Sequence, residues 1–375
     1  MKSKYVALPK KRFWKIFFPI VIILLFILGA RETTLLSHKY GFDRNHLSQK
    51  KEGRPKVLVV TCSYMFGERL AAKRFLDSFA RLNIPATEVI IPSIETNGLG
   101  YKWHTNLFLK LARKWVKPDL VLCITPLFLP HFEDVPQFSL VTGPDTNPPL
   151  RLFLHNHLFL ASESHDYITN YALQPWQKLT LEIYPSVGKT DFETPQFKSI
   201  FYCGANWDPL RNSDNYRWVY QQLDQQGIIT FYGPKEAWHM YQNYRGLIPM
   251  DSNKFHTAMR ECGIGLCLHS QLHLDSATPT ARIFELAAAG SIIICDDHPF
   301  VRKHFKDSVL YINHRLGREE ILAQIRAHYN WIITNPEKAH QKAQRAHQIF
   351  CEHFTLESMI KRIIEAYEKN YTHTN

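Results

Sequence analysis

The stretch that most limits how this chain can fold is TPTARIFELAAAGSIIICDD, residues 278–297. It joins a short helix with an alanine-rich end to Gly290, which suits the left-handed position that ends a helix, and then to the apolar run SIIIC. Such a run is typical of a parallel strand covered on both faces. Arg282 and Glu285 are three residues apart, so on a helix they share one face near its start. The stretch therefore predicts one helix–strand unit of a doubly wound α/β domain, with a cation and an anion at the helix start.

The same alternation of strand and helix runs through most of the chain. We expect strands in KVLVVTCS, ATEVIIP, PDLVLCI, QFSLVTG, HLFLAS, SIFYCGA, IITFYG, GIGLCLHS, SIIIC and SVLYI. Helices are expected at residues 67–83, 101–116, 165–173, 215–225, 253–260 and 300–305, with three closing helices between residues 318 and 370. This order predicts parallel sheets with right-handed crossovers. YPSVGKTDFETP combines proline, glycine and charges and indicates a linker, so we expect two Rossmann-like doubly wound domains, residues 55–184 and 185–375.

An apolar segment precedes these domains. FWKIFFPIVIILLFILGA, residues 13–30, carries one charge near its start and reaches the lower length limit for crossing a bilayer. Five basic residues before it favour a cytoplasmic N-terminus. We therefore expect residues 1–30 to be a basic tail with a single-pass transmembrane anchor, and residues 31–54 to be a stalk. A cleaved signal peptide is the alternative, and the side of the membrane that holds the folded domains is left open.

Composition narrows the class of protein. The chain has 375 residues and is 45% hydrophobic and 21% charged, which fits a globular protein. Its net charge of +11 is explained by a membrane surface or a phosphate-rich ligand as well as by nucleic acid. The basic residues are dispersed and no nucleic-acid motif accompanies them, so we expect no nucleic-acid partner. The seven cysteines form no CxxC pair and are expected to be small apolar core residues. The nineteen histidines show no HxxxH or HExxH pair in a helical context, so no metal site is expected.

Four segments together resemble the GT-B glycosyltransferases of group 1, most closely the spore-maturation CgeB-like branch. They are YPSVGKTDF, FYCGANWDPLRNSDNY, YRGLIPMDSNKFHTAMRECGIGLCLHS and ARIFELAAAGSIIICDDHPFVRKHF. The resemblance covers roughly residues 185–367 in sequence and the first half by architecture only. It implies an N-terminal acceptor domain and a C-terminal donor domain facing a cleft, and transfer of a sugar from a nucleotide-sugar donor to a glycan, lipid or protein.

The resemblance also gives roles to particular residues. Glu285 matches the family glutamate that accepts hydrogen bonds from the ribose hydroxyls, and Arg282 would face the diphosphate and stabilise the leaving group. The helix N-terminus, with Thr280 before it, adds N–H donors at the same place. Gly204, Asn206 and Arg211 correspond to the family's first glycine turn on the donor side. Protein cations carry the charge in this scheme, so neither a metal nor another cofactor is implied. The alternative is that Arg282 and Glu285 form an ion pair with a structural role only.

One departure concerns the donor sugar. Many retaining relatives carry two glutamates seven residues apart, and the first would fall on Ala277 here. Asp275 or Ser276 could replace it, so inversion and retention both stay open.

A catalytic base, if the enzyme inverts, is expected on the first domain. The candidate is Asp145, in TGPDTNPP after the fourth strand. The alternative is that Asp145 only stabilises a turn. Weaker candidates are His104, His131, His165, Asp296 and Asp297.

Three other functions compete with a membrane-anchored glycosyltransferase. An inactive GT-B shell that tethers a partner at the membrane is one, and Ala277 favours it. An exostosin-like transferase is the second, because the anchor and the glycine-then-strand segment suit it as well. The third is another GT-B enzyme, an epimerase or a phosphorylase, although no motif for a pyridoxal-phosphate lysine is present.

Overall fold

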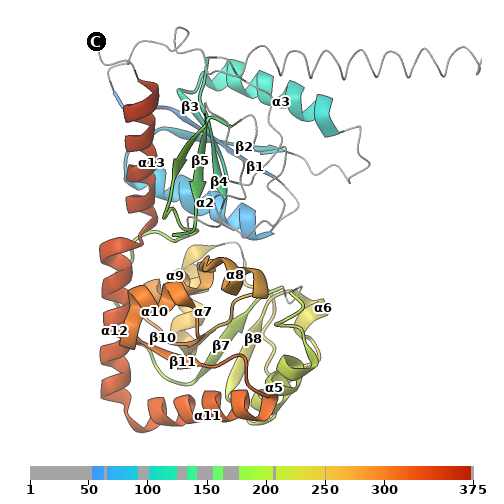
Figure 1. Ribbon diagram of the computed structural model, residues 1–375. Coiled ribbons are helices and arrows are strands. Elements are labelled where there is room, and N and C mark those ends of the chain that lie inside the picture. Colours follow the sequence, from blue (N-terminus) through green and yellow to red (C-terminus); the bar gives the residue numbers. More distant parts are fainter. Residues whose placement is uncertain are drawn as a thin grey trace, which may run out of the picture. The chain divides into compact units, whose positions relative to one another are not determined.

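The computed structural model describes residues 53–62, 66–91, 101–124, 132, 134–141, 155–163, 177–205, 208–249 and 251–372 (Figure 1). All of them lie in one compact unit, residues 44–375. The expected anchor at residues 13–30 and nearly all of the expected stalk lie outside the described residues. Within the described ranges, no helix has both the length and the apolar character needed to span a bilayer.

The first sheet has six strands in the order β2-β1-β3-β4-β5-β6, and every pairing in it is parallel. The strands are β1 (Val57–Cys62), β2 (Ala86–Ile91), β3 (Leu120–Cys123), β4 (Gln137–Val141), β5 (His157–Leu160) and β6 (Lys178–Thr180). Helices α2 (Phe66–Arg81) and α3 (Tyr101–Val116) connect the first three strands. The expected parallel strands are confirmed here, whereas the helix expected at residues 165–173 lies outside the described residues. Strand β6 was not expected, because three half-exposed residues give no periodic signal.

Side-chain alternation explains how this sheet is covered on both faces. Leu58 and Val60 of β1 belong to one apolar cluster with Leu109 of α3. Val57 and Val59 alternate with them and therefore point to the opposite face, which α2 covers. The apolar run of β1 is thus buried on both sides, as a parallel strand between two helix layers should be.

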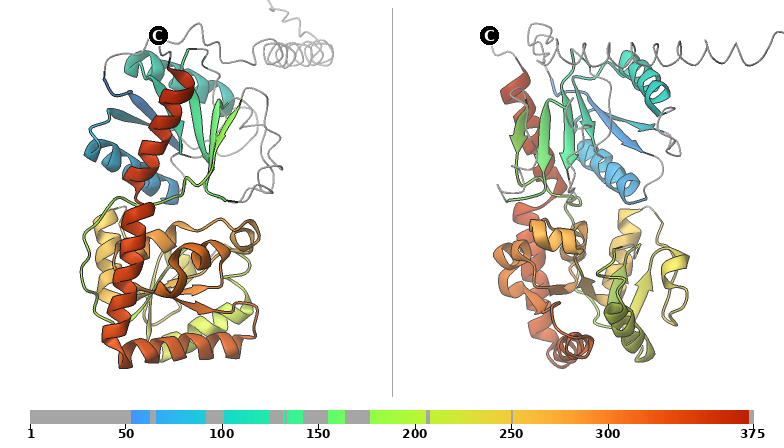
Figure 2. Two further views of the ribbon diagram at one scale, coloured as in Figure 1. Left: turned by 60° about the vertical axis from the view of Figure 1, so that its left-hand side comes forward. Right: turned by 45° about the vertical axis from the view of Figure 1, so that its right-hand side comes forward.

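The second sheet has five strands in the order β11-β10-β9-β7-β8, again all parallel. The strands are β7 (Ser199–Cys203), β8 (Ile229–Tyr232), β9 (Gly263–Cys267), β10 (Ile292–Asp296) and β11 (Val309–Ile312). The helices are α5 (Asp214–Gln225), α6 (Lys235–Trp238), α7 (Ser252–Cys262), α8 (Gln271–Ser276), α9 (Ala281–Ala288), α10 (Pro299–Phe305) and α11 (Arg318–Thr334), with a 3-10 turn at Lys306–Ser308. Figure 2 shows these helices on both faces of the sheet.

One glycine lets α9 lie close to this sheet, and a second one follows the end of the helix. A Cβ on Gly265 in β9 would overlap Cδ2 of Leu286, so only glycine leaves room for that α9 side chain. Gly290 has φ +73° and follows the end of α9, which confirms the left-handed position expected from the sequence. The short helix is therefore pressed against the centre of the sheet with its first turn at the carboxyl end of the strands.

The last helices bridge the two sheets. Helix α12 (Pro336–His353) packs on α9 and β10 of the second sheet, whereas α13 (Leu356–Tyr371) packs on α2 of the first (Figure 1). The ring of Tyr371 lies 5.3 Å from that of Phe138 in β4, and its hydroxyl donates to the carbonyl oxygen of Asn156 at 3.0 Å. We expected all three closing helices to lie with the second domain, but the last one covers the first sheet instead.

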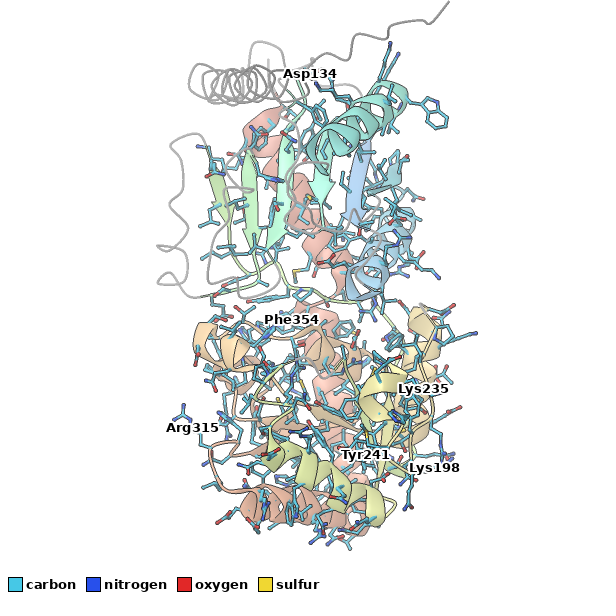
Figure 3. All side chains as sticks on the ribbon, turned by 90° about the vertical axis from the view of Figure 1, so that its right-hand side faces the viewer. Asp134, Lys198, Lys235, Tyr241, Arg315 and Phe354 are labelled. Atoms are coloured by element: carbon cyan, nitrogen blue, oxygen red, sulfur yellow. The ribbon has the colours of Figure 1, made fainter. Side chains whose placement is uncertain are left out.

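An aromatic cluster holds the crossing from α12 to α13. Phe354, labelled in Figure 3, has its ring 5.4 Å from Phe284, 5.5 Å from Phe300 and 5.7 Å from Tyr184. Its carbonyl oxygen accepts a hydrogen bond from the hydroxyl of Ser186 in the linker. The chain connects the two sheets twice, through the linker and through the α12–α13 junction. These two connections therefore pack on each other.

Six cysteines are free thiols: Cys123, Cys203, Cys262, Cys267, Cys295 and Cys351. Four of them, Cys123, Cys262, Cys267 and Cys295, are buried, as expected for small apolar core residues.

Candidate functional site

Strand order identifies where a ligand would bind in the second sheet. In chain order its strands are arranged 2-1-3-4-5, so the direction of winding reverses between β7 and β9. Open α/β sheets bind ligands outside the carboxyl ends of the strands at such a reversal. Cys203 ends β7 and Cys267 ends β9, so the candidate site lies just beyond these two residues.

Arg282 lies at this point. Its Nη2 donates to the carbonyl oxygen of Cys203 at 3.2 Å, and its guanidinium stands 5.5 Å from the ring centre of Phe201 in β7. Its Nη1 is 2.6 Å from Oε2 of Glu285, one turn further along α9. The first turn of α9 therefore presents a fixed cation to the carboxyl end of β7, and the i,i+3 pair expected from the sequence is formed.

Glu285 joins the two sheets. Its side chain is 6% exposed, and its Oε1 is 2.6 Å from Nη2 of Arg74, which lies in α2 of the first sheet. Burial by itself would raise the pKa of Glu285, but Arg282 and Arg74 outweigh burial and hold that pKa at about 2. The carboxylate is thus ionised at any physiological pH and shared by two arginines.

Arg74 is a site residue that sequence reasoning did not find. It is itself only 6% exposed, and its Nε donates to the hydroxyl of Ser252 in α7 at 3.3 Å. His256, also in α7, is buried nearby; burial and the Arg74 charge lower its pKa to about 4, so it is neutral. The LAAKRF segment shows only an amphipathic helix, and nothing in it indicates a partner in the other domain.

A second buried pair lies at the end of β9. His269 Nδ1 is 2.6 Å from Oδ1 of Asp296, and the peptide N–H of His269 donates to Oδ2 at 2.6 Å. Burial opposes a charge on both groups, yet each raises the charged fraction of the other: the pKa of His269 is raised and that of Asp296 is lowered. The pairing therefore favours the protonated imidazole of His269 beside the ionised carboxylate of Asp296. Asp296 was a weak candidate base, and its carboxylate is committed to His269 here.

Two neutral histidines surround this pair. The ring of His298 stacks on His269 with centroids 4.0 Å apart, and its Nε2 is 3.1 Å from the carbonyl oxygen of His273. Burial and the His269 charge lower the pKa of His298 to about 3 and that of His273 to about 4. Among the three histidines, His269 is therefore the one whose pKa is raised.

The other expected donor-side residues lie around the same strand ends. Gly204 follows β7, and its carbonyl oxygen accepts a hydrogen bond from Nε1 of Trp238 at 2.7 Å. Arg211 is held by Asp208, whose Oδ1 accepts from the Arg211 peptide N–H at 3.0 Å. Thr280 precedes the first turn of α9 in extended conformation, and its hydroxyl makes no capping bond to that helix. Asn206 lies outside the described residues.

Ala277, at the position of the expected first glutamate, ends α8 with φ 52°. Of the two suggested replacements, Asp275 is exposed and accepts a bond from Nε2 of Gln271 at 2.7 Å, whereas Ser276 is buried. Asp297 accepts from Nε of Arg302 at 2.6 Å.

The expected catalytic base, Asp145, lies outside the described residues, as do His131, His165 and the side chain of His104.

A metal could be held by one group within the described ranges. Ligand atoms of Cys267, His269 and Cys295 lie within 4.8 Å of one another, and all three residues are buried. However, His269 Nδ1 is already bonded to Asp296. No spacing in the sequence indicated this group, because Cys295 is far from the other two members in the chain.

The comparisons with known proteins agree with this geometry. Residues 211–365, which cover most of the second sheet and the closing helices, match a family described as Glycosyl transferase-like. No curated protein matches the chain.

Solved structures with similar folds span nearly the whole chain. HepE from Anabaena, in complex with UDP and glucose, has a TM-score of 0.55 at 13% identity, over 84% of this chain and 100% of that one. An alpha-glucosyltransferase in complex with UDP and a 13-mer DNA has a TM-score of 0.56 at 10% identity, over 83% and 99%. Sucrose-phosphate synthase from Thermosynechococcus elongatus has a TM-score of 0.54 at 8% identity, over 84% and 99%. The fold is therefore GT-B, and with the family match it makes the protein a glycosyltransferase.

Proposed function

We propose that the protein transfers a sugar from a nucleotide-sugar donor, bound at the carboxyl ends of β7 and β9, to a glycan, lipid or protein acceptor. The observation that carries the donor site is the position of Arg282. Its guanidinium is held at the carbonyl of Cys203, beside the first turn of α9 and at the point where the winding of the sheet reverses. A diphosphate placed there would meet a fixed cation and the positive end of a helix together.

In this proposal Arg282 and Glu285 divide the work. Arg282 stabilises the negative charge that builds on the diphosphate as the glycosidic bond breaks. Glu285 accepts hydrogen bonds from the ribose hydroxyls. Its two ion pairs with arginine do not prevent this, because an ionised carboxylate has about four lone-pair sites. Arg282 and the positive end of α9 take the place of a metal, and the reaction needs no cofactor.

The remaining features of the proposal come from the sequence. Residues 13–30 anchor the protein as a single-pass membrane protein with a cytoplasmic basic tail. The CgeB-like branch is the nearest group, and Asp145 is the base if the enzyme inverts. UDP is the first nucleotide to test, since HepE and the alpha-glucosyltransferase were both solved with it.

The test is a thermal-shift screen of the whole chain against UDP, GDP, CMP and their sugars. One nucleotide should raise the unfolding temperature, since a ligand at a hundred times its Kd stabilises by about 2.7 kcal/mol. Arg282→Lys and Glu285→Gln, each compared with its own ligand-free protein, should lose the shift. Arg217→Ala is the matched control: it breaks an exposed i,i+3 pair with Asp214 in the same domain and should keep the shift.

The competing function is a GT-B shell without a donor site. Ala277 is the observation in its favour, because it leaves the first-glutamate position without a carboxylate. A folded protein that shifts with none of the nucleotides would overturn the transferase proposal in favour of this shell.

A further inference from the structure

The outer face of α3 carries two apolar side chains that the rest of the described protein leaves uncovered. Trp115 is 89% exposed and Leu111 is 57% exposed. They are four residues apart and form one stripe along the helix. The inner face of the same helix is ordinary: Leu109 is buried in the core of the first sheet, with Ala112 and Val116 packed against it. The stripe is therefore not a core face left open.

Lysines form a second row beside this stripe. Lys110, Lys114 and Lys117 are all exposed. Lys110 and Lys114 are four residues apart and lie on one side of the helix, and Lys117 comes directly after its last residue, Val116. The sequence from 101 to 118 contains no acidic residue at all. Arg113, by contrast, is paired with Asp134, which Figure 3 labels beside α3. We call the five exposed residues Lys110, Leu111, Lys114, Trp115 and Lys117 the α3 patch.

The α3 patch lies where the chain enters the first sheet. Lys117 is followed closely by Asp119, whose Oδ2 accepts from the peptide N–H of Lys56 at 2.8 Å, and whose own N–H donates to the carbonyl of Lys56 at 2.8 Å. Lys56 and Arg54 are themselves exposed and add charge of the same sign. Residues 31–54 join the proposed anchor to this end of the sheet, and 24 residues can span at most about 86 Å.

We propose that the α3 patch docks on an anionic lipid surface. Tryptophan prefers the interface between headgroups and acyl chains, and lysines beside it pair with anionic headgroups. A second copy of the chain fits less well, because a two-fold contact would set the same three lysines against each other. Two apolar side chains also fall far short of the roughly 800 Å² per partner that a stable protein interface buries.

Docking would fix the orientation of the first domain. Because the α3 patch lies at the amino ends of β1 and β3, the carboxyl ends of these strands point away from the lipid. The argument from the length of residues 31–54 depends on the proposed anchor at residues 13–30. The α3 patch itself does not depend on the proposed donor site.

The test uses the full chain reconstituted into vesicles of phosphatidylcholine alone or of phosphatidylcholine mixed with phosphatidylglycerol, with brominated acyl chains as quenchers. The emission of Trp115 is obtained as the difference between wild type and Trp115→Phe. In anionic vesicles it should shift to the blue and be quenched, and it should recover at high salt, where the Debye length falls to about 3 Å. In neutral vesicles quenching should be much weaker.

The anchor alone could bring Trp115 close to the bilayer without any docking of the α3 patch. Charge variants distinguish this case from docking of the patch on lipid. The triple variant Lys110→Gln, Lys114→Gln and Lys117→Gln should lower the docking equilibrium about a hundredfold, at roughly 1 kcal/mol for each lysine. A control that removes the exposed lysines Lys235, Lys254 and Lys338 from the other domain should dock like wild type. Both triple variants should keep their nucleotide thermal shift, so failure of docking and failure of the donor site are read separately.

Three results would overturn docking on anionic lipid. The first is an unquenched Trp115 in anionic vesicles. The second is quenching that survives in the triple variant at the α3 patch, which would mean that the anchor alone brings Trp115 to the bilayer. The third is a blue shift that depends on protein concentration without quenching, which would indicate a second copy.

Discussion

The buried carboxylate of Glu285 predicts a specific acid sensitivity of the fold. Its pKa falls from 4.5 to about 2 on folding because Arg282 and Arg74 outweigh burial. At about 1.4 kcal/mol for each tenfold change in proton affinity, this difference corresponds to about 3 kcal/mol of stability at neutral pH. The group is almost fully buried, so solvent screening does not reduce this figure much.

The sign of the pH dependence follows from the lower pKa in the folded state. The stabilisation is fully present above the unfolded value of 4.5, and it is lost as the pH falls toward about 2. Glu285→Gln removes the titrating group but keeps one acceptor oxygen for an arginine. We expect the variant to be less stable than wild type by about 3 kcal/mol at pH 7, and by only about 2 kcal/mol at pH 3.5.

The assay is denaturant unfolding of both proteins across this pH range, with Asp214→Asn as control. Asp214 is also paired with an arginine at i,i+3, but its side chain is 93% exposed, so its replacement should change stability little at any pH. A gap between wild type and Glu285→Gln that stays constant from pH 7 to pH 3.5 would refute the reasoning, because it would show that the arginines do not depress the pKa of this carboxyl.

Two further predictions concern the second sheet. Gly265→Ala should destabilise the fold by about 1–3 kcal/mol, since the new Cβ would overlap Leu286. As a control, the Cβ of Gly67→Ala in α2 meets nothing within 4 Å, so this variant should be neutral or slightly stabilising. Thermal unfolding that ranks the two variants the other way would be inconsistent with the packing of α9. Asp296→Asn should destabilise the fold by about 3–5 kcal/mol, because it leaves the buried His269 without its anion. Since the pKa of His269 is raised on folding, this loss of stability should shrink as the pH rises above the pKa of a free imidazole. A loss that does not change with pH would contradict the charged pair.

Periodicity was sufficient to predict the longer regular elements of the described residues. Helix α3 runs from Tyr101 to Val116, which are the bounds expected for it, and Gly290 has the left-handed conformation that its position after an alanine-rich helix required. The i,i+3 spacing of Arg282 and Glu285 predicted their contact. These features depend on neighbours within one or two turns, which is the range over which a sequence pattern carries information.

What the pattern could not show depends on contacts between distant segments. Arg74 reaches Glu285 only because α2 and α9 meet in the folded chain, and His269 pairs with Asp296 only because β9 and β10 are neighbours. Helix α13 shows the same limit, because its sequence predicts a helix but not which of the two sheets it covers. Helix α8 was missed for a different reason, since six residues are too short for a period to emerge.

The most direct test of the donor site is a structure of the chain with the nucleoside diphosphate that the thermal-shift screen selects. We predict the diphosphate within hydrogen-bond distance of Arg282 and the first turn of α9, beyond the ends of β7 and β9, with a ribose hydroxyl on Glu285. A nucleotide bound at any other place, with Glu285 and Arg282 contacting only each other and Arg74, would contradict the proposed donor site.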